Sequence, residues 1–340
     1  MSKRISVMGA GMFGFVLTRY LARKYPENKI MLYDSNQSLL EYLREKRSHP
    51  LHFPEFPLPS NVCPSKDLRQ ILAMSEIILL AVPTQAVRPA AKKINSYLTH
   101  PLVIVNVAKG LEMNSGKRIS EIIQEEINGE YVYAVLSGGT IAGEMIKGSP
   151  VAMEVACQNE EISRELQVIF SSNKLRVYRN EDIIGVELAG ALKNPLSIAS
   201  GIAQGLGFGF STTSALVSRG SLEIKRMALS LGAQEKTYSL GGQAAMGDIM
   251  TSCFGPTRNR QFGELIAKEN SVTKALEAMK REGKLVEGYS TSKAVNHVAL
   301  KLGVEMPVQQ QVFQILYQRR KPREALENLM LRELKPISEQ

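Results

Sequence analysis

A glycine-rich turn near the start of the chain constrains the fold more than any other feature of the sequence. The residues Gly9-Ala-Gly-Met-Phe-Gly14 directly follow an apolar run, Ile5–Met8, and open a segment, 13–25, with apolar residues at helical spacing. A second apolar run, 29–33, then ends in Asp34. Strand, glycine turn, helix and strand in this order predict a dinucleotide-binding unit.

Each glycine has a physical reason in such a unit. Gly9 permits the tight turn, Gly11 lets the backbone approach a pyrophosphate, and Gly14 allows the helix to pack closely on the strand. Asp34 lies 20 residues after Gly14, where an acidic side chain accepts hydrogen bonds from the adenosine ribose and repels a 2'-phosphate. We therefore expect NAD to be preferred over NADP. The alternative is that Asp34 only caps the helix that follows.

The alternation of strands and helices continues after this unit. Near-continuous apolar runs, which are typical of parallel strands covered by helices on both faces, occupy residues 76–82, 102–107, 131–136 and 151–155. Residues 38–46 have a helical pattern. The Pro-rich stretch 50–64 interrupts the alternation and is interpreted as a surface excursion.

From about Ile183 the pattern changes to long segments with 3.6-residue periodicity, at 186–204, 213–231 and 290–302. Strand-like runs nearly disappear. We therefore predict an α/β N-terminal Rossmann-like domain with a mostly parallel sheet, residues 1–184, followed by an all-α C-terminal domain, residues 185–340.

Composition limits the context in which the chain works. Its 340 residues exceed the size at which one hydrophobic core keeps growing. The three scattered cysteines share no CxxC spacing, which favours a reducing compartment. No apolar run approaches the roughly 18 to 20 residues of a membrane span, and Ile5–Met8 is too short for a signal peptide. We expect a cytoplasmic protein without membrane insertion.

The basic net charge does not indicate a nucleic-acid partner. The chain has 42 basic and 33 acidic residues, a net charge of +9. The lysines and arginines are spread along the sequence and no nucleic-acid-binding motif accompanies them. A solvated surface is the simplest interpretation; an anionic membrane and anionic small molecules are the other partners that such a charge can indicate.

Two segments of the predicted helical domain carry groups suited to chemistry. Lys193 stands among small and apolar neighbours in the segment 185–195 and is either a catalytic ammonium or a lysine whose head reaches the surface. Pro195 can kink this helix beside a cleft. Residues 257–259, Thr-Arg-Asn, offer a hydroxyl, a guanidinium and an amide, which suit phosphate oxygens; a helix-capping turn is the alternative.

The chain resembles the NAD(P)-dependent glycerol-3-phosphate dehydrogenase family, particularly its bacterial members. Ordered motifs along nearly the whole chain carry the resemblance: Gly9 to Gly14, Val107-Ala-Lys-Gly110, Ser137-Gly-Gly-Thr-Ile-Ala142, Gly190-Ala-Leu-Lys-Asn194, Ser218-Arg-Gly220, Gly247-Asp248, Thr257-Arg-Asn-Arg-Gln-Phe-Gly263 and Val286-Glu-Gly288.

The resemblance implies a reversible hydride transfer between dihydroxyacetone phosphate with NAD(P)H and sn-glycerol 3-phosphate with NAD(P)+, which supplies glycerophospholipid synthesis. Lys193 matches the proton acceptor of the family, Lys109 a second lysine that meets substrate and cofactor, and Asp248 the carboxylate beside the catalytic lysine. A protonated lysine stabilises the negative charge that develops on the ketone oxygen, and a second ammonium nearby would lower its pKa.

The implied contacts form two sets. The substrate positions are Lys109, Gly138, Thr140, Lys193, Asn194, Asp248, Thr257, Arg258 and Asn259. The cofactor positions are the glycine motif and Asp34 together with Met12, Phe13, Lys109, Ala142, Arg258, Leu285 and Glu287. The cofactor is NAD, with NADP possible; we expect a homodimer and no metal site.

Several positions depart from the family pattern. Gly139 stands where the family has proline and is expected to loosen its loop, Gly209-Phe-Ser211 replaces Gly-Asp-Asn, and Ser252 replaces a threonine. Two other functions stay open: a related dehydrogenase that acts on another hydroxy or keto acid, which the residues 257–259 disfavour, and a cofactor-binding sensor without catalysis, which the two lysines and Asp248 disfavour.

Overall fold

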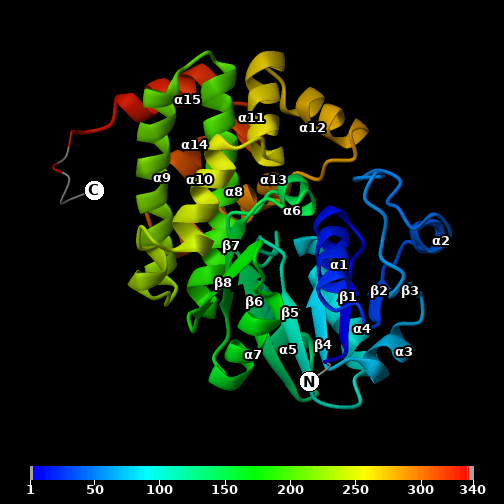
Figure 1. Ribbon diagram of the computed structural model, residues 1–340. Coiled ribbons are helices and arrows are strands. Elements are labelled where there is room, and N and C mark those ends of the chain that lie inside the picture. Colours follow the sequence, from blue (N-terminus) through cyan, green and yellow to red (C-terminus); the bar gives the residue numbers. More distant parts are fainter. Residues whose placement is uncertain (1–2, 335, 337–340) are drawn as a thin grey trace.

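The computed structural model describes residues 3–334 and 336, which form a sheet region followed by a helical region (Figure 1). In the view of Figure 1 the helices of the second region stand over one end of the sheet. The elements of the first region are β1 (Ile5–Met8), α1 (Met12–Lys24), β2 (Ile30–Tyr33), α2 (Gln37–Lys46), β3 (Val62–Pro64), α3 (Leu68–Met74), β4 (Ile77–Leu80), the 3-10 helix η1 (Thr84–Ala86), α4 (Val87–Tyr97), β5 (Leu102–Asn106), α5 (Ile119–Glu126), β6 (Tyr131–Ser137), α6 (Ala142–Ile146), β7 (Val151–Ala156), α7 (Glu160–Phe170) and β8 (Leu175–Asn180).

The eight strands form one sheet in the order β3-β2-β1-β4-β5-β6-β7-β8. All neighbouring pairs are parallel except β6 with β7. Every residue of β1 and β4 is buried, because helices cover both faces of a parallel sheet. The strand order reverses at β1, and such a switch point leaves room beyond the carboxyl ends of the strands for a ligand.

Two strands were not expected from the sequence. The Pro-rich stretch 50–64 is not only a surface excursion, because its last residues form β3 and pair with β2. The other strand, β8, alternates buried Leu175 and Val177 with exposed Arg176 and Tyr178. Both strands lie at the edges of the sheet, where short length and one polar face weaken the apolar pattern.

The second region is helical throughout its described residues. Its elements are α8 (Ile183–Gly205), α9 (Phe210–Ser230), η2 (Glu235–Tyr238), the π-helix η3 (Gln243–Gly247), α10 (Asp248–Phe254), α11 (Arg258–Glu269), α12 (Val272–Arg281), α13 (Glu287–Leu302), α14 (Pro307–Gln318) and α15 (Pro322–Met330). An α/β region with a mostly parallel sheet followed by an all-α region confirms the predicted fold class. Within the described ranges, no helix has the length and apolar composition needed to cross a membrane.

Helix α8 is the central helix of this region. The Asp182 side chain caps its N-terminus by accepting a hydrogen bond from the Gly185 amide at 2.8 Å. From Gly185 to Ala203 every residue is buried, so α8 packs against neighbours on all sides. The helix continues through Pro195. Lys193 is therefore held inside the protein, where a charged group needs partners.

Candidate active site

The glycine turn between β1 and α1 leaves space for a phosphate group. Gly9 has φ +112°, and a Cβ there would lie 2.5 Å from the Ala81 carbonyl oxygen. A Cβ at Gly14 would lie 2.0 Å from the Gly9 carbonyl oxygen, whereas one at Gly11 would have no heavy atom within 4 Å. Gly11 is also the N-cap of α1 and supplies no capping side chain. Open space at the positive end of a helix suits a pyrophosphate.

Asp34 joins the end of β2 to this turn. Its Oδ2 accepts a hydrogen bond from the Ala10 amide at 2.7 Å, and its Oδ1 accepts one from the Asn36 amide at 2.8 Å. Asn36, and not Asp34, caps α2, because the Asn36 side chain accepts a hydrogen bond from the Leu39 amide at 3.1 Å. The alternative that Asp34 only caps the following helix is therefore wrong.

Two lysines share one buried carboxylate. Lys109, which follows β5, donates from Nζ to Asp248 Oδ2 at 2.6 Å and to the Gly138 carbonyl oxygen at 2.7 Å. Lys193 on α8 forms an ion pair with the other oxygen, Oδ1, at 3.1 Å and donates to the Ser252 hydroxyl. Ser252 donates in turn to Asp248 Oδ1 at 3.2 Å. This lysine–aspartate cluster brings three predicted catalytic residues together, from the loop after β5, from α8 and from α10.

The charged groups of the cluster shift each other's pKa values. Burial lowers the pKa of Lys109, and the charge of Lys193 lowers it further, while Asp248 acts in the opposite direction. Burial raises the pKa of Asp248, but the two lysines outweigh this effect and its pKa lies below the ordinary value. Asp248 is therefore ionised at neutral pH. Two ammonium groups around one carboxylate attract an anionic oxygen.

Asparagine side chains connect the cluster to α11 and α13. Asn194 donates from Nδ2 to the Lys109 carbonyl oxygen at 2.8 Å, and its Oδ1 accepts a hydrogen bond from Asn259 Nδ2 at 2.9 Å. Asn259 Oδ1 accepts one from the Gly288 amide at 3.1 Å. This hydrogen-bonded chain places residues 257–259 beside the lysine–aspartate cluster.

Arg258 and Thr257 stand at the start of α11. Thr257 is the N-cap, but its hydroxyl donates to the Ser252 carbonyl oxygen at 2.7 Å and does not cap the helix. Arg258 is half-buried, and its guanidinium makes no hydrogen bond or ion pair with the described residues. Its charge, second to burial, lowers the pKa of His52. The Arg258 guanidinium is thus available for a ligand.

The remaining predicted positions surround this site on other elements. The Thr84 amide and hydroxyl donate to Glu287 Oε1 at 3.4 and 3.3 Å, which joins η1 to α13. The Thr140 amide donates to the Gly138 carbonyl oxygen, which Lys109 also contacts. Four predicted cofactor positions remain: Met12 and Phe13 at the start of α1, Ala142 at the start of α6 and half-exposed Leu285 before α13. In the part of the chain that the structure describes, none of them has a hydrogen bond or ion pair to the lysine–aspartate cluster.

Gly139 lets its loop pack closely on the helical region. A Cβ at this position would lie 2.5 Å from the Thr251 hydroxyl oxygen and 2.6 Å from the Gly247 carbonyl oxygen. The loop therefore lies directly on the π-helix η3 and on α10. Glycine here permits a close backbone approach, because a Cβ would meet the Gly247 carbonyl oxygen.

Sequence reasoning missed three residues near the site. Ser252 was named only as a departure from the family pattern and was not assigned to the site, although it contacts both Lys193 and Asp248. His49 contacts the Ala10 carbonyl oxygen in the glycine turn, and His52 lies in the field of Arg258. The only signal was a pair of histidines, His49 directly before the Pro-rich stretch 50–64 and His52 within it. Both are far from the glycine motif in sequence, so the sequence did not place them beside it.

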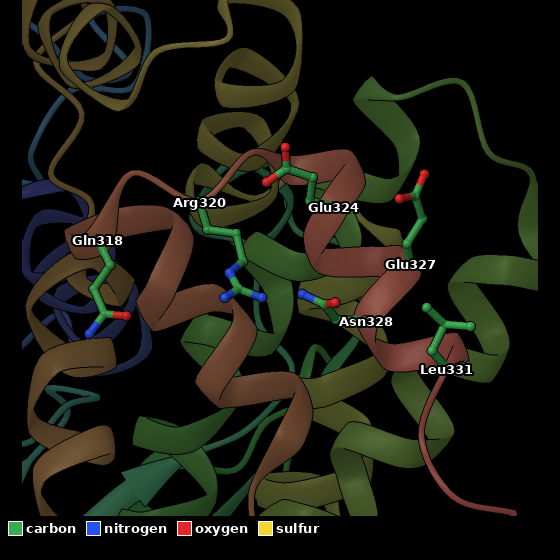
Figure 2. Close-up of a pocket in the computed structure, with 6 residues that line it drawn as sticks. All are labelled: Gln318, Arg320, Glu324, Glu327, Asn328 and Leu331. Atoms are coloured by element: carbon green, nitrogen blue, oxygen red, sulfur yellow. The ribbon is translucent and has the colours of Figure 1, made fainter.

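A surface hollow on the helical region holds none of these residues. It lies at the end of α14 and along α15 and is lined by Gln318, Arg320, Glu324, Glu327, Asn328 and Leu331 (Figure 2). The site described above therefore does not coincide with this hollow.

Comparison with known proteins identifies the family. Residues 4–163 match the family model for the N-terminus of NAD-dependent glycerol-3-phosphate dehydrogenase, and residues 182–327 match the model for its C-terminus. The chain belongs to the NAD-dependent glycerol-3-phosphate dehydrogenase family. The resemblance inferred from the sequence motifs is confirmed.

Individual members of the glycerol-3-phosphate dehydrogenase family match over almost the full length. Glycerol-3-phosphate dehydrogenase [NAD(P)+] of Halothermothrix orenii is 37% identical over 335 residues, which cover 98% of this chain and 96% of the relative. The enzyme of Citrifermentans bemidjiense is 37% identical over 98% of this chain and 99% of its own. The crystal structure of glycerol-3-phosphate dehydrogenase from Coxiella burnetii superposes with a TM-score of 0.91 at 30% identity and covers 97% of this chain and 99% of that one.

Proposed function

We propose that this chain is an NAD(P)-dependent sn-glycerol-3-phosphate dehydrogenase, which reversibly converts dihydroxyacetone phosphate and NAD(P)H into sn-glycerol 3-phosphate and NAD(P)+. Family membership supports the reaction class. The observation that carries the proposal is the buried lysine–aspartate cluster, in which Asp248 contacts Lys109 with one oxygen and Lys193 with the other. Residues 257–259, whose side chains suit phosphate oxygens, lie next to this cluster.

Lys193 is the proton donor in the reducing direction. The nicotinamide, when bound, supplies the hydride to the ketone carbon. The ketone oxygen then gains negative charge, which the Lys193 ammonium stabilises before it transfers a proton to that oxygen. Lys109 supplies a second positive charge, and Asp248 and Ser252 hold Lys193 Nζ in one place. In the reverse direction neutral Lys193 accepts the proton of the alcohol.

Arg258 holds the substrate phosphate. Its guanidinium has no hydrogen-bond or ion-pair partner among the described residues, and a guanidinium binds phosphate oxygens with two parallel hydrogen bonds. Thr257, Asn194 and Asn259 provide polar groups around it, and Gly138 with Thr140 forms the loop on the Lys109 side. Binding energy at the phosphate positions the ketone against the nicotinamide.

The glycine turn binds the cofactor. Gly9, Gly11 and Gly14 admit the pyrophosphate at the N-terminus of α1, and Asp34 accepts hydrogen bonds from the adenosine ribose. A carboxylate at this place repels the 2'-phosphate of NADPH, so NADH is the preferred cofactor. Contacts from Met12, Phe13, Lys109, Ala142, Arg258, Leu285 and Glu287 complete the cofactor site.

The decisive experiment follows the absorbance of NADH during incubation of the purified chain with dihydroxyacetone phosphate. We expect rapid oxidation of NADH, slower oxidation of NADPH, and almost none when dihydroxyacetone without its phosphate is the substrate. Equal rates with non-phosphorylated ketones would indicate a related dehydrogenase with another substrate. Binding of NADH without oxidation by any ketone would indicate a sensor.

We also propose that the chain works as a homodimer in the cytoplasm and supplies sn-glycerol 3-phosphate for glycerophospholipid synthesis. The scattered cysteines and the absence of a membrane-crossing helix in the described ranges are compatible with this location. Light scattering during gel filtration tests the dimer, which predicts twice the 37.6 kDa mass of one chain.

A further inference from the structure

His49 makes a specific contact with the glycine turn. This residue lies between α2 and β3 and is 3% exposed. Its Nδ1 accepts hydrogen bonds from the amides of Leu51 at 3.1 Å and His52 at 3.0 Å, so Nδ1 carries no proton. In the neutral ring the hydrogen is therefore on Nε2, which donates to the Ala10 carbonyl oxygen at 3.1 Å.

The His49 contact is made to the carbonyl oxygen of the peptide bond between Ala10 and Gly11. This peptide bond is trans, so the Ala10 carbonyl and the Gly11 N–H point in opposite directions. The carbonyl points to His49, and the N–H points to the other side of the turn, where Gly11 is exposed. The Ala10 amide is held in turn by Asp34 at 2.7 Å. His49 and Asp34 together hold Ala10 on both sides.

The His49 ring is itself held by packing. It contacts Phe15 of α1 edge-on, with ring centroids 5.5 Å apart, and stacks on His52 at 4.5 Å. The titratable groups that face it are His52 and Asp34. Burial lowers the pKa of His49 to about 4, the charge of His52 adds to this effect, and the Ala10 carbonyl and Asp34 oppose it. The ring is neutral at pH 7.

We propose that His49 is a positioning residue of the cofactor site, which holds the Ala10–Gly11 peptide so that the Gly11 N–H faces the cofactor pyrophosphate. This inference rests on the proposed function, because the dinucleotide provides the pyrophosphate. A backbone N–H binds an anion well only when its direction is set in advance. Loss of the Nε2 contact lets this peptide rotate and weakens cofactor binding, while Lys193 and Arg258 keep their places.

Three variants separate the Nε2 contact from general destabilisation. His49→Phe keeps a ring against Phe15 but removes both nitrogens. His49→Gln places an amide NH₂ close to the position of Nε2 and can again donate to Ala10. His100→Phe is the matched control, because His100 also contacts a backbone carbonyl, that of Ser75 at 2.8 Å, but does so between α4 and β5.

We expect His49→Phe to raise the Kd and KM for NADH about tenfold, because the misdirected Gly11 N–H loses roughly one well-formed hydrogen bond to the pyrophosphate. Its kcat at saturating NADH and its KM for dihydroxyacetone phosphate should change less than about twofold. His49→Gln should recover most of the affinity, and His100→Phe should bind NADH like the wild type. Wild-type affinity in His49→Phe, or an equal loss in His100→Phe, would overturn the proposal.

Hydrogen–deuterium exchange of the cofactor-free protein gives a second readout that does not depend on activity. The amides of residues 9–12 should exchange faster in His49→Phe than in the wild type and in His100→Phe. Unchanged exchange would overturn the proposal. If the wild type binds neither NADH nor NADPH, the proposed function fails, and exchange at these residues still decides whether His49 holds the turn.

Discussion

Asp248 divides its two oxygens between two ammonium groups, and this division decides what each lysine can do. Lys109 takes Oδ2 and the Gly138 carbonyl, and Lys193 takes Oδ1 and the Ser252 hydroxyl. Both ammonium groups are therefore oriented by the protein before any substrate arrives. Orientation in advance is the largest contribution that a protein makes to stabilising a developing charge.

Substitution of Lys193 tests its role as the proton donor. In Lys193→Ala we expect kcat to fall about 10²- to 10⁴-fold, the usual contribution of general acid–base catalysis. The Kd for NADH, measured by fluorescence titration, should change less than about twofold, because the glycine turn stays intact. Lys174→Ala removes an exposed lysine before β8 and serves as the control. Undiminished turnover in Lys193→Ala would exclude this residue as the proton donor.

Close contact between helices decides where α11 starts relative to the lysines. A Cβ at Gly201 on α8 would lie 1.9 Å from the Arg260 carbonyl oxygen, and a Cβ at Gly263 on α11 would lie 2.1 Å from the Ile198 carbonyl oxygen. Glycines on both helices allow the backbones to touch. The first turn of α11, which carries Arg258, therefore lies beside α8 and its lysine.

Another helix junction depends on a buried carboxylate. Glu223 on α9 accepts hydrogen bonds from the Val308 amide at 2.8 Å and the Gln309 amide at 3.2 Å, at the N-terminus of α14. Burial raises its pKa to about 7, although the two amides oppose this effect. A proton is thus bound more tightly in the folded than in the unfolded protein between pH 4.5 and 7.

This raised pKa gives a defined pH dependence. The contribution of Glu223 to the free energy of unfolding should fall as the pH rises from about 4.5 to about 7, because the unfolded state gives up the proton first. The contribution of Glu223 is at most about 3 kcal/mol. Urea unfolding should show that, between pH 5 and pH 8, the free energy of unfolding falls in the wild type relative to Glu223→Gln. Glu277→Gln, at an exposed carboxylate of α12, is the control; equal pH effects in both variants would contradict the prediction.

A buried carboxylate on α8 connects the helical region to the sheet region. Glu187 Oε1 accepts hydrogen bonds from the Ser120 amide at 2.8 Å and the Tyr133 hydroxyl at 2.5 Å. Its Oε2 accepts them from the Ser120 hydroxyl at 2.6 Å and from Arg118 Nη1 at 3.1 Å. Burial raises the pKa of Glu187, and these partners act against that rise. The carboxylate links α8, which carries Lys193, to α5 and β6.

Removal of the arginine from this network tests its contribution to the whole molecule. In Arg118→Met the buried carboxylate loses its positive partner, and we expect the free energy of unfolding to fall by about 3 kcal/mol. Arg164→Met breaks an exposed ion pair with Glu160 and should cost less than about 1 kcal/mol. Denaturant titrations of both variants provide the measurement. An equal fall in the free energy of unfolding in both variants would show that the ion pair of Arg118 with Glu187 stabilises the protein no more than an exposed one.

The sequence determined the features that depend on neighbours along the chain. Apolar runs predicted β1, β2, β4, β5, β6 and β7, and helical periodicity predicted α8, α9 and α13, because burial of one face or both requires these patterns locally. The glycine motif predicted the turn before α1 for the same reason, because the turn and the start of the helix need residues without a side chain at fixed positions along the chain. Ordered motifs also indicated the family, which the comparisons confirm.

Only the tertiary structure decided which distant residues meet. The edge strands β3 and β8 owe their place to pairing with β2 and β7, and pairing across the chain leaves little local pattern. The contact of His49 with Ala10 spans 39 residues, and that of Lys109 with Asp248 spans 139. Such contacts come from the packing of helices on strands, which local sequence does not encode. The residue types that do chemistry are thus visible in the sequence, while their orientation depends on the folded chain.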